Sequence, residues 1–304
     1  MRQELVEPIA QLKRQRHAVI LAHNYQVGEV QDIADYTGDS LGLSRQAAST
    51  DADVIVFCGV HFMAETAAIL SPAKTVLLPD LHAGCPMADM LTAEQLRALK
   101  AQHPGAAVVC YVNSTAEVKA ESDCCCTSAN AVQVVQSFPA DREILFVPDQ
   151  YLGDHVMQMT GRRLILWPGY CPTHARILDT QIARLRQAYP GAVVLAHPEC
   201  PRPVRAAADH VLSTGGMLRV VRESAAGEFI VATEIGMLHR LRKDNPGKVF
   251  HGVSDVAVCP NMKRIRLDNV LWSLQEMRHP IRVPEDIRVK ALRAIERMLK
   301  IPGG

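Results

Sequence analysis

Short apolar runs alternate with amphipathic segments along most of this chain. The runs that we interpret as strands cover residues 19–22, 54–57, 75–78, 108–110, 144–147, 164–167, 193–196, 229–232 and 248–250. Helical patterns lie between them, for example at residues 40–48, 129–136 and 218–222. Continuous apolar runs are typical of strands buried on both faces, and strand–helix alternation is typical of parallel sheets covered by helices. We therefore predict an α/β protein.

The polar residues that follow these strands recur at a nearly fixed interval. Three polar triplets begin at His23, Tyr111 and His197, which lie 88 and 86 residues apart. A hydroxyl residue follows 17 residues after the start of each triplet, and a Cys-Pro pair follows after 62, 60 and 62 residues. These recurring residues are Ser40, Ser128, Thr214, Cys85, Cys171 and Cys259. Because such self-similarity indicates repeated structural units, we predict three three-layer αβα units related by a pseudo-threefold axis, with parallel sheets around a central active site.

The unit boundaries follow from the same repeat. We expect the first unit to span residues 1–81, the second residues 82–169 and the third residues 170–259. Residues 3–16 and 286–300 lie outside the repeat, and their apolar spacing predicts amphipathic helices. We expect the C-terminal helices, within residues 260–304, to complete the first unit.

Composition narrows the class of protein. The 304 residues carry a net charge of +1, so no global attraction to nucleic acid or to a membrane surface is expected. No apolar run approaches the roughly 18 residues that span a bilayer, and the charged start lacks the apolar core of a secretion signal. Nine cysteines in such a chain are typical of a reducing compartment rather than of a disulfide framework. We expect a cytoplasmic protein.

Only three of the nine cysteines recur in the repeat. Cys85, Cys171 and Cys259 each lie in a loop just beyond a predicted strand, where ligand sites of open α/β sheets form. Soft thiolate ligands select zinc, cuprous copper or an iron–sulfur cluster. Three cysteines without a fourth would leave one iron of a [4Fe–4S] cluster open to act as a Lewis acid. His174, three residues after Cys171, leaves a Cys3His zinc site as the alternative.

The remaining recurring residues suit binding and acid–base chemistry. Ser40, Ser128 and Thr214 precede helical patterns, so they are either N-caps or part of anion sites at helix N-termini. Glu199 is our first choice for proton transfer, with Tyr25 and His197 as its partners. His23, Tyr111 and Asn113 are expected to orient carboxylates through hydrogen bonds.

Several stretches resemble the quinolinate synthase family in a single order over residues 17–265. They are AHNYQ (22–26), GDS (38–40), HAGCPMADM (82–90), YVNSTAEVKAESD (111–123), CCTSANA (125–131), PDQYLG (148–153), HPEC (197–200), STGGM (213–217) and CPNM (259–262). The resemblance implies an enzyme of NAD biosynthesis that condenses iminoaspartate with dihydroxyacetone phosphate and releases quinolinate, phosphate and water. It also implies a [4Fe–4S] cluster held by Cys85, Cys171 and Cys259.

The resemblance assigns residues to the site as well. Substrate contacts carry over onto His23, Ser40, Tyr111, Asn113, Ser128, His197, Glu199 and Thr214. Tyr25 and His174 match positions near the site, and we expect Val112, Pro198 and Ser213 in the same binding segments. Some relatives carry a CxxCxxC run around the third ligand, whereas only Cys259 is present here. The enzyme that supplies iminoaspartate is a further expected partner.

Two other functions remain open from the residues alone. A zinc enzyme with His174 as the fourth ligand would act on a phosphorylated keto compound. A sensor of iron or oxygen would use the cluster as a switch, although the chain carries no motif for nucleic-acid binding.

Overall fold

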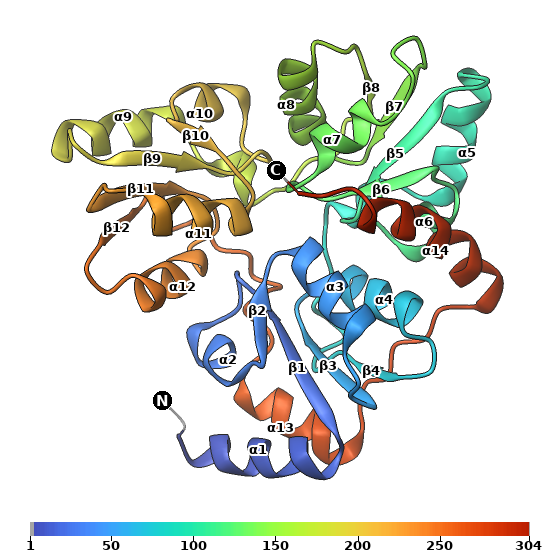
Figure 1. Cartoon of the computed structure of the whole chain (residues 1–304), viewed down its shortest axis with the longest axis vertical. Coiled ribbons are helices and arrows are strands. Elements are labelled where there is room, and N and C mark those ends of the chain that lie inside the picture. Colours follow the sequence, from blue (N-terminus) through green and yellow to red (C-terminus); the bar gives the residue numbers. More distant parts are fainter. Residues whose placement is uncertain (1–2, 304) are drawn as a thin grey trace.

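The computed structural model describes residues 3–303, and over this range the strands form three separate four-stranded sheets. Every pair of neighbouring strands within these sheets is parallel. The strand order is the same in each sheet: β2-β1-β3-β4, β6-β5-β7-β8 and β10-β9-β11-β12. Figure 1 shows the three units as three lobes, coloured blue, green and yellow to orange. The predicted α/β class with three parallel-sheet units is confirmed.

The first unit begins with a strand that the sequence predicted closely. Its strands are β1 (Ala18–His23), β2 (Tyr36–Gly38), β3 (Val54–Cys58) and β4 (Thr75–Leu77). Its helices are α2 (Gly28–Ile33), α3 (Ser40–Ser49) and α4 (His61–Leu70). All five residues of β3 are buried, as expected for a central parallel strand.

The second unit repeats this plan. Its strands are β5 (Ala107–Tyr111), β6 (Cys124–Cys126), β7 (Ile144–Val147) and β8 (Ile165–Leu166). Its helices are η2 (Ala88–Met90), α5 (Ala93–Gln102), α6 (Ala116–Ala120), α7 (Ala131–Gln136) and α8 (Gln150–Thr160). Asp149 caps the start of α8, because its carboxylate accepts hydrogen bonds from the backbone amides of Tyr151 and Leu152. The helix ends at Gly161, whose φ of 69° is a left-handed conformation that glycine adopts with little strain.

The third unit has the same order of elements. Its strands are β9 (Val193–Ala196), β10 (His210–Val211), β11 (Glu228–Ala232) and β12 (Val249–Gly252). Its helices are η3 (His174–Arg176), α9 (Asp179–Ala188), α10 (Arg202–Ala206), α11 (Thr214–Glu223) and α12 (Met237–Asp244). One face of this sheet packs on a small core of its own, with Ile182, Val194 and Ile230 fully buried, separate from the large core that continues through the other units.

The edge strands β2, β6 and β10 were missing from the prediction. They contain only two or three residues each, too few for an apolar pattern to stand out. Asp35, Asp123 and Asp209 fix them in place, because each carboxylate accepts from a backbone amide of the neighbouring central strand at 2.7–2.8 Å. These three residues lie 88 and 86 residues apart, so they belong to the repeat and could have been found by it.

The terminal helices divide between two units. Helices η1 (Gln3–Leu5), α1 (Val6–Gln15) and α13 (Leu267–Glu276) pack together at the first unit. Helix α14 (Glu285–Leu299), which we expected over the first unit, packs mainly on α6 and β6 of the second unit and also reaches α4 (Figure 1). Its buried face includes Ala291, Ile295 and Met298, so it joins two units through apolar contact. Within residues 3–303, no helix combines the length and apolar character needed to cross a membrane.

Candidate active site

A single cavity of about 270 Å³ is lined by residues from all three units. Thirteen of the sequence-predicted residues line it: His23, Tyr25, Ser40, Cys85, Tyr111, Asn113, Ser128, Cys171, His174, His197, Glu199, Thr214 and Cys259. The other three, Val112, Pro198 and Ser213, are buried and adjoin lining residues in the sequence. The structure thus brings together residues that are separated by more than 200 positions.

The strand ends explain this convergence. His23 ends β1, Tyr111 ends β5, and His197 directly follows β9. These strands occupy equivalent inner positions in the three sheets, and each sheet presents its carboxyl edge to the cavity. Because ligand sites of open parallel sheets form beyond the carboxyl ends of the strands, one repeated position supplies three walls of one site.

The recurring hydroxyls are not the side-chain caps of their helices. The cap of α3 is Asp39, whose carboxylate accepts from the Gly42 amide at 2.8 Å. The cap of α11 is Ser213, whose hydroxyl accepts from the Gly216 amide at 3.1 Å. Ser40 and Thr214, one residue later, line the cavity at the helix N-termini, where backbone amides and the helix dipole favour an anion.

Two buried imidazoles have a fixed tautomer. His23 Nδ1 accepts from the Tyr25 amide at 3.2 Å, and His197 Nδ1 accepts from the Glu199 amide at 3.3 Å. Burial lowers the pKa of both imidazoles to about 3, so both rings are neutral near pH 7. With Nδ1 engaged as an acceptor, the proton of each neutral ring lies on Nε2, which makes that atom a hydrogen-bond donor.

Glu199 is the anionic centre of the site. Burial acts to raise its pKa, but the interaction with His174 and the hydrogen bonds from His174 and Tyr111 outweigh burial and hold the pKa below its usual range. The Tyr111 hydroxyl donates to Glu199 Oε1. Burial, and then the charge of Glu199, raise the pKa values of Tyr25 and Tyr111, so both phenols keep their protons.

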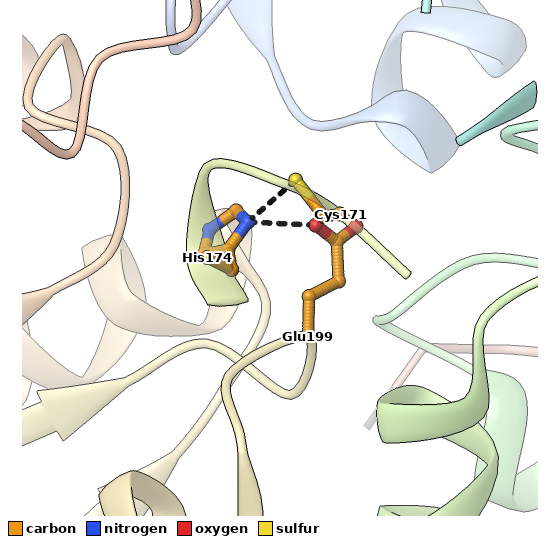
Figure 2. Close-up of side chains that lie close together, drawn as sticks. All are labelled: Cys171, His174 and Glu199. Carbon is orange, nitrogen blue, oxygen red and sulfur yellow. Dashed lines mark hydrogen bonds and ion pairs between the residues drawn. The ribbon is translucent and has the colours of Figure 1, made fainter. Parts of the chain in front are cut away.

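His174 connects Glu199 with a second group of hydroxyls. Its Nδ1 lies 2.8 Å from Glu199 Oε2 and 3.2 Å from Cys171 Sγ. Dashed lines mark these two contacts in Figure 2. Its Nε2 lies 2.9 Å from the Thr233 hydroxyl, which in turn lies 2.6 Å from the Tyr25 hydroxyl. Cys171, His174 and Glu199 also form a compact group with one potential metal-ligand atom each.

The three recurring cysteines share the cavity and are partly buried. Burial raises the pKa of all three thiols, to about 12 for Cys85. The interactions of Cys85 with Cys259 and of Cys171 with Cys85 add to the increase. Three neighbouring thiols of this kind lose their protons readily only when a cation binds to the sulfurs in their place. Three such sulfurs are a donor set that suits a soft metal or an iron–sulfur cluster.

An ion pair between the buried Glu234 and the partly exposed Lys263 supports the loop of Cys259. Glu234, fully buried just after β11, accepts from the Cys259 amide at 3.0 Å and from the Gly236 amide at 2.7 Å. Its carboxylate also pairs with the Lys263 ammonium at 2.8 Å, and Lys263 donates to the Tyr25 carbonyl. One carboxylate therefore positions a cysteine loop and, through Lys263, the Tyr25 segment.

Sequence reasoning missed Thr233, Glu234 and Arg176. The first two follow β11. The equivalent pair is Gly59-Val60 in the first repeat and Pro148-Asp149 in the second, so Thr233 has no polar counterpart and Glu234 has one in the second repeat alone. Arg176 lines the cavity two residues after His174 and provides a cation in the same cavity as the predicted anion sites. Only its proximity to the Cys171 motif could have indicated it.

A cavity with acid–base groups and three thiols, placed at the carboxyl ends of parallel strands, defines an enzyme active site. The family model that matches residues 7–300 is described as quinolinate synthetase A protein. The chain is 60% identical over 302 residues to the quinolinate synthase of Dehalococcoides mccartyi strain CBDB1, covering 99% of this chain and 100% of the relative. It is 56% identical over 299 residues to the quinolinate synthase of Geotalea uraniireducens, covering 98% of this chain and 98% of the relative. It is also 56% identical over 305 residues to that of Thermus thermophilus, covering 98% of this chain and 97% of the relative. The chain therefore belongs to the quinolinate synthase family of enzymes.

Proposed function

We propose that this enzyme forms quinolinate for NAD biosynthesis by condensing iminoaspartate with dihydroxyacetone phosphate, with loss of phosphate and water. The observation that carries the proposal is the convergence of all three recurring cysteines and ten predicted polar residues on one cavity. Membership of the family supports the product.

The donor set fits a [4Fe–4S] cluster held by Cys85, Cys171 and Cys259. When bound, such a cluster would supply an open iron as a Lewis acid. His174 is a poor fourth ligand, because Glu199 or Cys171 engages its Nδ1 and Thr233 engages its Nε2. Both ring nitrogens already have partners within the protein, which favours the open cluster over a Cys3His zinc site.

The chain's own groups suit two anionic substrates. The N-termini of α3 and α11 lie at the cavity beside Ser40 and Thr214, and each offers backbone amides to a carboxylate or a phosphate. His23 and His197 can donate Nε2–H to carboxylate oxygens without adding charge. Arg176 supplies the positive charge that the neutral imidazoles do not.

Proton transfer is assigned to Glu199 and the two phenols. An ionised, buried carboxylate is a base, and the protonated Tyr25 and Tyr111 are acids, so the cavity holds both partners that enolisation and dehydration require. The small, mostly buried cavity also protects an imine from hydrolysis. Because the imine is short-lived in water, we propose that the enzyme that supplies iminoaspartate is a partner of this chain.

The test is an assay with both substrates on protein purified without oxygen. We expect a brown protein that contains iron and acid-labile sulfide and that releases quinolinate and phosphate in equal amounts. A colourless protein that contains zinc would overturn the cluster and favour the zinc enzyme. A protein that contains iron and sulfide but forms no quinolinate would overturn the function and favour a sensor.

Tyr25→Phe tests the acid role separately. Removing the phenol hydroxyl should lower kcat by about 100-fold or more while the iron content stays at the wild-type level. Equal loss of turnover and iron would show that Tyr25 is structural.

A further inference from the structure

One side-chain hydrogen bond joins the end of β1 in the first unit to the start of α11 in the third unit. Asn24 directly follows β1 and is fully buried, and its Nδ2 donates to Thr214 Oγ1 at 2.9 Å. Thr214 is the first residue of α11 and lines the cavity. Asn24 can therefore act on the site through the Thr214 hydroxyl.

The N-termini of α3 and α11 lie close together at the same place. A Cβ added to Gly215 would lie 2.6 Å from Asp39 Oδ2, which is closer than a Cβ and a carboxylate oxygen approach in proteins. Gly215 therefore allows the start of α11 to approach Asp39, the residue that caps α3. The same close approach of the first and third units brings Thr214 within hydrogen-bond distance of Asn24.

The repeat gives the other two recurring hydroxyls no equivalent partner. The residues that match Asn24 are Val112 and Pro198, the second members of the other two polar triplets. Val112 lines a small pocket together with Ser40, but its side chain has no N–H to donate, and neither has that of Pro198. Thr214 is thus the one recurring hydroxyl that accepts a hydrogen bond from this position of the repeat.

The Asn24 bond fixes the direction in which the Thr214 hydroxyl points. An amide nitrogen only donates, so Thr214 Oγ1 accepts on one lone pair and keeps its own proton. Because Thr214 lines the cavity at a helix N-terminus, an anion bound there is a suitable acceptor for that proton. Consecutive hydrogen bonds polarise one another in a buried site, so donation by Asn24 strengthens donation by Thr214.

We propose that Asn24 is a positioning residue, which directs the Thr214 hydroxyl as a donor toward the anionic group of a substrate. The inference rests on the proposed function, because that function supplies the anion, either the phosphate of dihydroxyacetone phosphate or a carboxylate of iminoaspartate. The anion site at the start of α11 is therefore built by two units, since the first unit supplies the residue that orients the donor of the third.

Asn24→Leu tests this role, because leucine has a similar branched shape and no N–H. The measurements are the binding of dihydroxyacetone phosphate and of succinate, a stable dicarboxylate, to the anaerobic cluster-containing enzyme, together with kcat and KM. We expect the dissociation constant of at least one of these ligands to rise about fivefold to tenfold, with a matching rise in KM, while kcat and iron content stay within about twofold. The ligand whose binding weakens identifies the group that Thr214 contacts.

Asn245→Leu is the matched control. Asn245 is partly buried at the end of α12, its amide donates to the Leu241 carbonyl, and it does not line the cavity described above. Both dissociation constants should stay at the wild-type values in this variant. If Asn24→Leu does not fold, Asn24→Ala provides the same comparison.

Double-mutant cycles show whether Asn24 acts through Thr214. The double variant with Asn24→Leu and Thr214→Val should bind the ligand no more weakly than Thr214→Val alone, whereas the effects of Asn24→Leu and Ser40→Ala should add. Unchanged binding of both ligands, a loss of kcat without a change in binding, or additive losses with Thr214→Val would overturn the proposal. Tighter binding in Asn24→Leu would also overturn it, because Thr214 would then donate its proton to Asn24. A wild-type enzyme that binds a ligand but forms no quinolinate would instead overturn the proposed function.

Discussion

The nine cysteines of this chain lie in two different environments. Six are fully buried: Cys58, Cys110, Cys124, Cys125, Cys126 and Cys200. All of these except Cys200 lie in strands. The other three, Cys85, Cys171 and Cys259, are partly buried and line the cavity. Burial raises the pKa of thiols in both groups, to about 12 for Cys85 at the cavity and also for Cys124 in β6. Thiol acidity therefore does not separate the groups, whereas position beyond a strand end does.

One core cysteine, Cys110, has a more acidic thiol than Cys85 of the cavity. Burial acts to raise the pKa of Cys110, but hydrogen bonds from Cys125 and Ser114 outweigh it and lower the pKa to about 7. Cys110 lies within β5 and does not line the cavity described above. A search for acidic thiols alone would therefore have selected a residue outside the cavity.

The largest expected difference between the two groups concerns iron. Replacing Cys85, Cys171 or Cys259 by Ser, one at a time, should remove most of the iron and lower activity by several orders of magnitude, because each supplies a third of the proposed ligands. Cys200→Ser is the matched control and should keep both. Iron, sulfide and quinolinate formation are the measurements, and iron loss in Cys200→Ser would contradict the assignment.

The ion pair of Glu234, whose carboxylate holds the Cys259 loop, can be removed without substituting a cysteine. Glu234→Gln removes the charge that pairs with Lys263. Breaking a fully buried ion pair costs about 3–5 kcal/mol in the free energy of unfolding, and we expect a smaller loss here because the Lys263 side chain is 21% exposed. Anaerobic denaturant unfolding measures it. Glu228→Gln on the same strand is the control, because Glu228 is partly exposed and pairs with His251 near the surface. If both substitutions lower the free energy of unfolding equally, the ion pair of Glu234 does not stabilise the fold more than a surface pair does.

The same substitution in the core should affect stability rather than iron. Cys58 is fully buried in β3, so Cys58→Ser places a hydroxyl in an apolar strand and should lower the free energy of unfolding by about 1–3 kcal/mol. Iron content should remain at the wild-type level. The comparison fails if Cys58→Ser loses iron while it remains folded.

Acidification should lower the free energy of unfolding, because the cavity contains buried imidazoles with a lowered pKa. The pKa of His197 is about 3 in the folded protein and about 6.5 when unfolded, so between these values the unfolded chain binds a proton that the folded chain does not. The free energy of unfolding should fall on acidification by up to about 1.4 kcal/mol per pH unit for this residue. His197→Asn should reduce that slope between pH 6 and 4, measured by denaturant unfolding, and an unchanged slope would contradict the lowered pKa.

Much of the fold could be predicted because each strand carries its own signal. The apolar runs at residues 144–147 and 193–196 coincide with β7 and β9, and the repeat selected the three cavity cysteines among nine. The edge strands escaped because two or three residues show no periodicity. Thr233 escaped because the equivalent residues, Gly59 and Pro148, are not polar, and Glu234 escaped because only Asp149 of the second unit matches it. A single polar residue after a strand is ordinarily a local hydrogen-bonding group.

The sequence by itself determined the number of units, their parallel sheets and which residues recur at the strand ends, because periodicity and strand length are local properties of a chain. The tertiary structure alone decided which partners those residues meet. Tyr111 of the second unit contacts Glu199 of the third, and Tyr25 of the first unit contacts Thr233 of the third, only because the three units are packed against one another. Contacts between distant segments depend on that packing, and no local pattern encodes them.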